Sequence, residues 1–218
     1  MDTSARKIWA ITAAMLCGMP TAPVTKSTDP PLAISVMINN RAGVPAATLA
    51  EAQQIATSVY RRIGLEIVWI DDAAAFDASA PHEREARAAA LQSLIVLHLV
   101  APSVESRLNL PLDVMGQAFR GSRIAAIFYG RVLNLTHSGV VTVADALGYV
   151  MAHELGHLLL PYGGHSPDGL MRDRLDQRLM SQHLLGFDRG QADAIRASVA
   201  ASRFQFRPSL RWSAHLWF

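Results

Sequence analysis

The sequence contains few cysteines and few lysines, and each scarcity excludes a class of protein. Its 218 residues include a single cysteine, Cys17, so neither a disulfide within the chain nor a cysteine-based zinc site can form. The only lysines are Lys7 and Lys26, and the positive charge otherwise comes from arginines scattered along the chain. A net charge of +2 without a dense basic run gives little support for a nucleic-acid surface, so we expect no nucleic-acid partner. A metal site in this chain has to use histidine, aspartate or glutamate.

The N-terminal residues have the pattern of an export signal. Two basic residues precede the uncharged, mostly apolar stretch 8–19, and prolines with small residues follow it. Because this stretch is shorter than the ~20 residues of a membrane span, we interpret residues 1–22 as a signal peptide and expect a secreted or periplasmic protein. The alternative is an uncleaved N-terminal membrane anchor, and a lipoprotein modified at Cys17 is a weaker one. No second apolar run is long enough to span a membrane, so we expect no stable membrane insertion of the mature chain.

The remaining chain suits one compact domain. Half of the residues are hydrophobic, and no internal repeat interrupts the sequence. Residues 23–31 are predicted to form a polar linker with prolines, and residues 32–200 the folded domain. The tail 201–218 alternates arginine with aromatic residues, and its role stays open.

The hydrophobic pattern predicts a fold that mixes strands and helices. Strands are predicted at 32–38, 65–70, 94–100, 114–121 and 124–132. Helices are predicted at 46–63, 143–160 and from 187 onward. The opening order of strand, helix and strand implies a parallel pair joined by a crossover, which places the domain in the α/β (α+β) class.

Several local features accompany these elements. Thr48 with Glu51, and Thr142 with Asp145, have the spacing of a capping box at the start of a helix. His98 is alone within an apolar strand and is expected to be an ordinary packed residue. The segment 71–87 is expected to be a loop or a loose helix, and 101–112 a loop. Two aspartates in an Arg-rich segment are expected to form surface ion pairs; these are Asp173 and Asp176.

His153, Glu154 and His157 form the pattern H-E-x-x-H on the predicted helix 143–160. Residues four apart lie one above the other on a helix, so both imidazoles can reach one metal ion. Zn²⁺ suits imidazole ligands and keeps an open position for a water molecule, whose pKa it lowers toward ~7. Glu154 projects beside the ion, where it can act as a general base and later pass the proton to a leaving amine. A chance match is the alternative, but unpaired polar groups on such an apolar helix would be costly.

The identity of a third ligand is less constrained. Glu154 is the last glutamate of the chain, so no later glutamate can serve. His165 is the nearest candidate, just after a predicted turn at 161–164, and Asp168 is the next. His183 and His215 lie farther along the chain.

The stretch HELGHLLLPYGGH followed by SPDGLM resembles the metzincin metalloproteases. That family has the pattern H-E-x-x-H-x-x-G-x-x-H before a Met-containing turn, and the H-S pair followed by L-M is particularly similar to its matrixin branch. The resemblance implies one catalytic Zn²⁺ held by His153, His157 and His165, with Glu154 as the base and Met171 as the Met-turn residue. It also implies a metzincin-like zincin domain: a twisted mixed sheet with a zinc-site helix and a C-terminal helix.

The sequence departs from the family pattern between its second and third histidines. Leu160 stands where the family has glycine, and His165 comes two residues later than the pattern places it. By the same resemblance, a peptide substrate lies antiparallel along an edge strand, either 114–121 or 124–132. The alternative is that both segments are ordinary interior strands of the sheet.

These observations lead to a zinc-dependent endopeptidase as the first hypothesis, with a peptide or protein as substrate. The alternative is a non-catalytic metal-binding or interaction module that keeps a protease fold. The intact Glu154 argues against this alternative, because a site without chemistry has no need of the base.

Overall fold

The computed structural model describes residues 32–70, 94–119 and 121–201. Four predicted segments lie outside the described residues: the signal peptide, the linker, the segment 71–87 and the tail from residue 202. Within the described ranges, no helix combines the length and the apolar content that crossing a bilayer requires.

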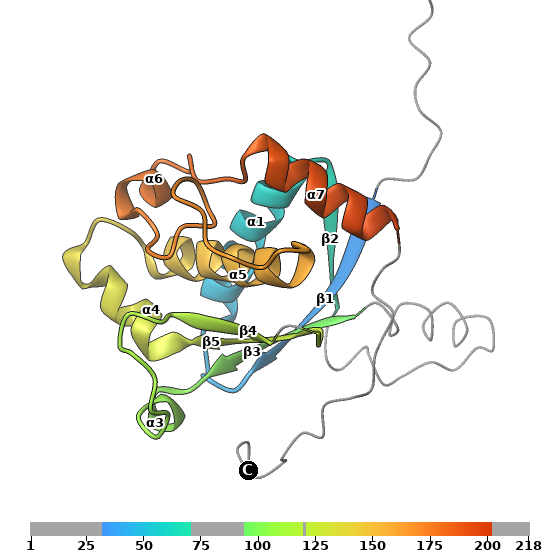
Figure 1. Ribbon diagram of the computed structural model, residues 1–218. Coiled ribbons are helices and arrows are strands. Elements are labelled where there is room, and N and C mark those ends of the chain that lie inside the picture. Colours follow the sequence, from blue (N-terminus) through green and yellow to red (C-terminus); the bar gives the residue numbers. More distant parts are fainter. Residues whose placement is uncertain (1–31, 71–93, 120, 202–218) are drawn as a thin grey trace, which may run out of the picture. The chain divides into compact units, whose positions relative to one another are not determined.

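Five strands form one mixed sheet with the order β2-β1-β3-β5-β4 (Figure 1). They are β1 (Leu32–Asn40), β2 (Leu65–Ile70), β3 (Ile95–Val100), β4 (Gly116–Phe119) and β5 (Ile124–Phe128). β1 pairs in parallel with β2 and β3, and β3 pairs in parallel with β5. The predicted parallel pair is therefore confirmed. β4 alone runs antiparallel, on β5, and forms one edge of the described sheet.

Three helices cover one face of this sheet. They are α1 (Ala46–Arg61), α5 (Val143–Leu159) and α7 (Arg189–Ala200). α1 and α5 lie side by side over the sheet (Figure 1), and the main hydrophobic core fills the space between the helices and the strands. Gly148 of α5 permits this close approach, because a Cβ there would lie 2.7 Å from the carbonyl oxygen of Ala52 in α1. α5, the helix that carries the H-E-x-x-H pattern, is thereby fixed against both α1 and the sheet.

A second, smaller cluster covers the opposite face. Along β5, Ala125 and Ile127 belong to the main core, whereas Ala126 and Phe128 face this second cluster. Residues between β3 and β4 pack over it, including the short helix α3 (Pro102–Glu105). The expectation of a loop over 101–112 therefore missed one helical turn.

The predicted strand 124–132 is wrong in its second half. The chain turns helical at α4 (Tyr129–Leu135), followed by a 3-10 turn, η2 (Thr136–Ser138). The carboxylate of Glu105 accepts a hydrogen bond from the amide of Gly130 at 2.7 Å, which satisfies a free donor at the start of α4. A contact from another part of the chain thus supports the start of α4.

Two other local predictions are also wrong. α1 begins directly after Pro45 without a side-chain cap, so Thr48 lies within the first turn and does not cap the helix. The ion pairs expected of Asp173 and Asp176 are not found among the described residues. The Asp176 side chain instead caps α6 (Gln177–Ser181) by accepting from the amides of Arg178 and Leu179. Asp173 accepts a hydrogen bond from the amide of Arg174.

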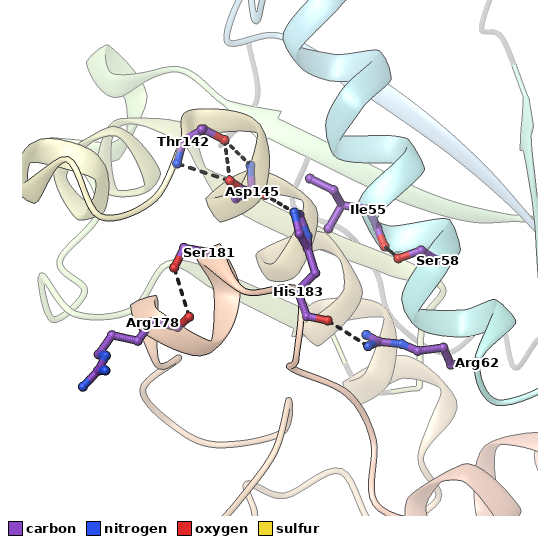
Figure 2. A network of polar contacts seen from close by, with 8 residues as sticks. All are labelled: Ile55, Ser58, Arg62, Thr142, Asp145, Arg178, Ser181 and His183. Carbon is purple, nitrogen blue, oxygen red and sulfur yellow. Dashed lines mark hydrogen bonds and ion pairs between the residues drawn. The ribbon is translucent and has the colours of Figure 1, made fainter.

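The start of α5 is held by a polar network that joins three parts of the chain (Figure 2). The predicted capping box is confirmed: Thr142 Oγ1 accepts from the amide of Asp145 at 3.0 Å, and the Asp145 carboxylate accepts from the amide of Thr142. The other Asp145 oxygen lies 3.6 Å from Nε2 of His183. The carbonyl oxygen of His183 accepts from Arg62, which follows α1, at 3.0 Å. The helix that carries H-E-x-x-H is therefore fixed at its first turn as well as along its length.

Candidate metal centre

Three histidine side chains meet at the C-terminal half of α5. Nε2 of His157 lies 3.0 Å from Nε2 of His153, one turn earlier, and 3.2 Å from Nε2 of His165 in the loop that follows the helix. These three form the one group within the described residues whose ligand atoms lie close enough together to hold a metal ion. Two ligand atoms at Zn–N distances of about 2.0–2.1 Å around a tetrahedral ion lie about 3.3 Å apart. The observed separations therefore fit such an ion.

The hydrogen bonding of His153 leaves its Nε2 available for a metal. Its Nδ1 lies 2.7 Å from the carbonyl oxygen of Leu170, and because a carbonyl only accepts, Nδ1 carries the proton. Burial lowers the pKa of His153 to about 4, against the opposing effect of this hydrogen bond, so the ring is neutral at physiological pH. A neutral ring protonated on Nδ1 presents a bare lone pair on Nε2, which is the form that binds metals.

The helix ends without the glycine of the family pattern. Leu160 takes an extended conformation, with φ −76° and ψ 130°, and Pro161 follows it. Gly163 then adopts a positive φ of 41°, in the left-handed region that glycine tolerates. The two additional residues are accommodated in this loop, which still brings His165 to the other two histidines.

The segment after His165 folds back beneath the histidines. The amide of Ser166 donates to the carbonyl of Met171 at 2.7 Å, and the amide of Leu170 donates to the carbonyl of Gly186 at 2.8 Å. Met171 is fully buried, and its sulfur packs against Gly156, where an added Cβ would lie 2.5 Å from it. Met171 therefore lies against the turn of α5 that carries His153 and His157, and a role as Met-turn residue stays a prediction from the resemblance.

The other candidate ligands lie elsewhere. Asp168 is outside the histidine group. His183 pairs with Asp145 at the opposite end of α5, and His215 falls outside the described residues. The structure thus groups His165, and neither Asp168 nor His183, with the two helix histidines.

Glu154 is buried beside this cluster, with 4% of its surface exposed. Burial raises the pKa of its carboxyl group to about 8, and a hydrogen bond with the backbone of Ala118 acts in the opposite direction. Among the described residues, no group forms a hydrogen bond with its Oε2. A buried carboxyl oxygen without a partner is costly, and a water molecule or cation next to it would remove that cost. The carboxyl group can therefore hold a proton or transfer it at the metal centre.

A cleft of about 380 Å³ opens over these side chains. It is lined by residues 113–118, by four residues of α5 that include His153 and Glu154, by Gly163 and His165, and by residues 173–175. Arg174 and Asp113 form an exposed ion pair of 3.2 Å. The edge strand β4 and the three histidines thus line one cavity.

Arg131 fixes the segment that leads into β4, a role that no motif in the sequence indicates. Its guanidinium is buried and donates to the carbonyl oxygens of Pro111 at 2.7 Å and Val114 at 2.5 Å. It also lies 4.8 Å from the centre of the Phe128 ring, a favourable cation–π position. Short-range patterns do not reveal such contacts, because the partners are distant in the sequence.

Comparison of the sequence with known protein families finds no matching family, and comparison with curated proteins finds no significant match.

Proposed function

We propose that the protein is a zinc-dependent endopeptidase with a metzincin-like catalytic domain. One observation supports this above all: three imidazole nitrogens converge beside a buried carboxyl group, in a cleft that an edge strand also lines. His153, His157 and His165 are the residues that hold the ion. A zinc ion held there would supply a Lewis acid for the scissile carbonyl and would lower the pKa of a bound water molecule.

Glu154 is the general base of the proposed reaction. A cation held by the three histidines favours the charged form of a nearby carboxylate, which counters the rise in pKa that burial causes. The ionised carboxylate takes a proton from the attacking water and passes it to the nitrogen of the leaving amine. The fixed start and buried flank of α5 keep the carboxyl group oriented for both transfers.

β4 is the proposed binding strand for the substrate backbone. It forms an edge of the described sheet, and residues 116–118 line the same cleft as the histidines. An extended peptide can pair with such an edge by β-augmentation, which recognises the main chain rather than one particular side chain. Of the two strands that the sequence suggested, β5 is interior and β4 is the one available.

The signal peptide predicted at residues 1–22 would direct the protein out of the cytoplasm, so we propose a secreted or periplasmic location.

The decisive experiment combines metal analysis of the purified protein with turnover of casein. We expect one zinc ion per chain, activity that a chelator abolishes and added zinc restores, and an inactive Glu154→Ala variant that still binds zinc. Activity that persists in Glu154→Ala would refute the proposed mechanism. Zinc binding without turnover of casein or a peptide library would favour the non-catalytic module.

A further inference from the structure

We propose that Gly116, the first residue of β4, is a positioning residue for the base: its missing side chain leaves the space that the Glu154 carboxyl group occupies. This inference rests on the proposed function for its effect on catalysis. The close approach between β4 and Glu154, on which the inference is built, does not depend on the proposed function.

The space is defined by three atoms of a single side chain. A Cβ at residue 116 would lie 2.5 Å from Oε1, 2.6 Å from Cδ and 2.7 Å from Cγ of Glu154. Contacts of this length are far inside van der Waals separation, so any side chain at residue 116 must displace Glu154. The backbone of Gly116 does not lie in the left-handed region, so the requirement is for space and not for conformation.

β4 cannot easily move away to relieve such a clash. Gly116 pairs with Ile127 in the sheet, and the amide of Phe128 donates to the carbonyl of Met115 at 2.9 Å. The preceding carbonyl, that of Val114, is held by the buried Arg131. Three consecutive residues of the cleft wall are therefore tied to β5 and α4.

If a Cβ is added at residue 116, the Glu154 side chain has to move, but it has little room to do so. It is almost fully buried, and its carboxyl group hydrogen bonds with the backbone of Ala118, two residues farther along β4. Because the clash reaches Cγ, rotating the terminal carboxyl group alone does not relieve it. An alanine at residue 116 therefore shifts the base relative to the histidines while leaving the histidines themselves in place.

The test is Gly116→Ala, measured for casein hydrolysis, zinc affinity and melting temperature. We expect kcat to fall by roughly tenfold to 100-fold, because a displacement of about 1 Å can cost that much, with KM and zinc affinity close to wild type. Gly190→Ala is the matched control, since an added Cβ there meets only Asp188 Oδ1, at 3.3 Å, in the first turn of α7. It should leave kcat unchanged.

A double-mutant cycle supplies a readout that does not depend on activity. If the clash is with Glu154, Gly116→Ala lowers the melting temperature in the wild-type background but not in the Glu154→Ala background, where the obstructing atoms are gone. This holds even if Gly116→Ala alone fails to fold, because Gly116→Ala/Glu154→Ala should then fold.

The outcomes separate this inference from the proposed function. Wild-type kcat in Gly116→Ala, or an equal loss of melting temperature in both backgrounds, overturns the role of Gly116. An active Glu154→Ala protein overturns instead the role of Glu154 as the base of the proposed reaction, and the stability cycle still reports whether the two residues compete for space.

Discussion

Nδ1 of His153 lies 2.7 Å from the carbonyl oxygen of Leu170, a residue seventeen positions later in the chain. This contact links the helix that carries two of the ligands to the segment that follows the third. It fixes the tautomer of the His153 ring and, with it, the direction of the lone pair on Nε2. If the three histidines hold a metal ion, its binding would therefore be coupled to the fold of the segment around Met171.

The choice between His165 and Asp168 as third ligand can be made by substitution. We expect His165→Ala to lose most of its bound zinc after dialysis against a weak chelator, because two imidazoles alone hold the ion poorly. Asp168→Ala should keep one ion per chain, since Asp168 lies outside the histidine group. The measurement is zinc per chain by elemental analysis, and the reverse pattern would show that the loop rearranges when the ion binds.

The stability of the metal-free protein should depend on pH in two opposite ways. The pKa of Glu154 is raised from 4.5 to about 8, so its contribution to stability is full below pH 4.5 and is lost as the pH rises to about 8. The pKa of His153 is lowered from 6.5 to about 4, so its contribution is full above pH 6.5 and is lost as the pH falls to about 4. We expect the highest melting temperature between about pH 4.5 and 6.5.

Glu154→Gln tests whether ionisation of Glu154 causes the fall in melting temperature expected as the pH rises. The amide does not ionise, so its metal-free melting temperature should stay level from neutral pH to pH 8, the folded-state pKa of the carboxyl group it replaces. Added zinc should have the same effect on the wild-type protein, because a cation favours the ionised carboxylate. An unchanged alkaline decline in Glu154→Gln would assign that decline to another group.

Removing the cap of α5 should destabilise the protein measurably. Thr142→Ala deletes the side-chain oxygen that accepts from the amide of Asp145, a loss of about 1 kcal/mol for such a cap. In a domain of this size the melting temperature should fall by roughly 2–4 °C. Thr48→Ala is the matched control: Thr48 lies within the first turn of α1 and caps nothing, so we expect little change. Equal losses in the two variants would contradict the role of the cap.

Replacing the buried Arg131 should destabilise the protein more than replacing a surface arginine. Arg131→Met keeps much of the side-chain volume but leaves buried carbonyls without a donor, at a cost of about 1–3 kcal/mol for each group that water cannot reach. We expect a lower melting temperature and a higher KM, since the wall that leads into β4 loses its support. Arg174→Met removes an exposed ion pair and should change stability by less than about 1 kcal/mol. A larger stability loss in Arg174→Met than in Arg131→Met would reverse this assignment.

The elements that the sequence predicted well are those whose signals are local. β2 matches its prediction at residues 65–70, and α5 begins and ends within one residue of the expected helix. For α5 the cap, the apolar face and the following proline all lie within the helix or next to it. The spacing of His153 and His157 also follows from helix geometry alone.

The features that the sequence did not predict depend on contacts between distant residues. The start of α4 depends on Glu105, twenty-five residues before Gly130. The apolar run from Ile124 gave no sign that the strand ends at Phe128. The close approach of Gly116 to Glu154 follows from how α5 lies against β4, which no local pattern contains.

The spacing of the three histidines along the chain also determines what metal uptake costs. His157 follows His153 by four residues, and His165 follows His157 by eight. The entropy lost on closing a loop grows with loop length, and the first of these loops is already closed by the helix. The second is held at its far end by the hydrogen bonds of Ser166 and Leu170. An ion bound there would therefore order very little additional chain, so we expect that the site could be emptied and refilled without unfolding the domain.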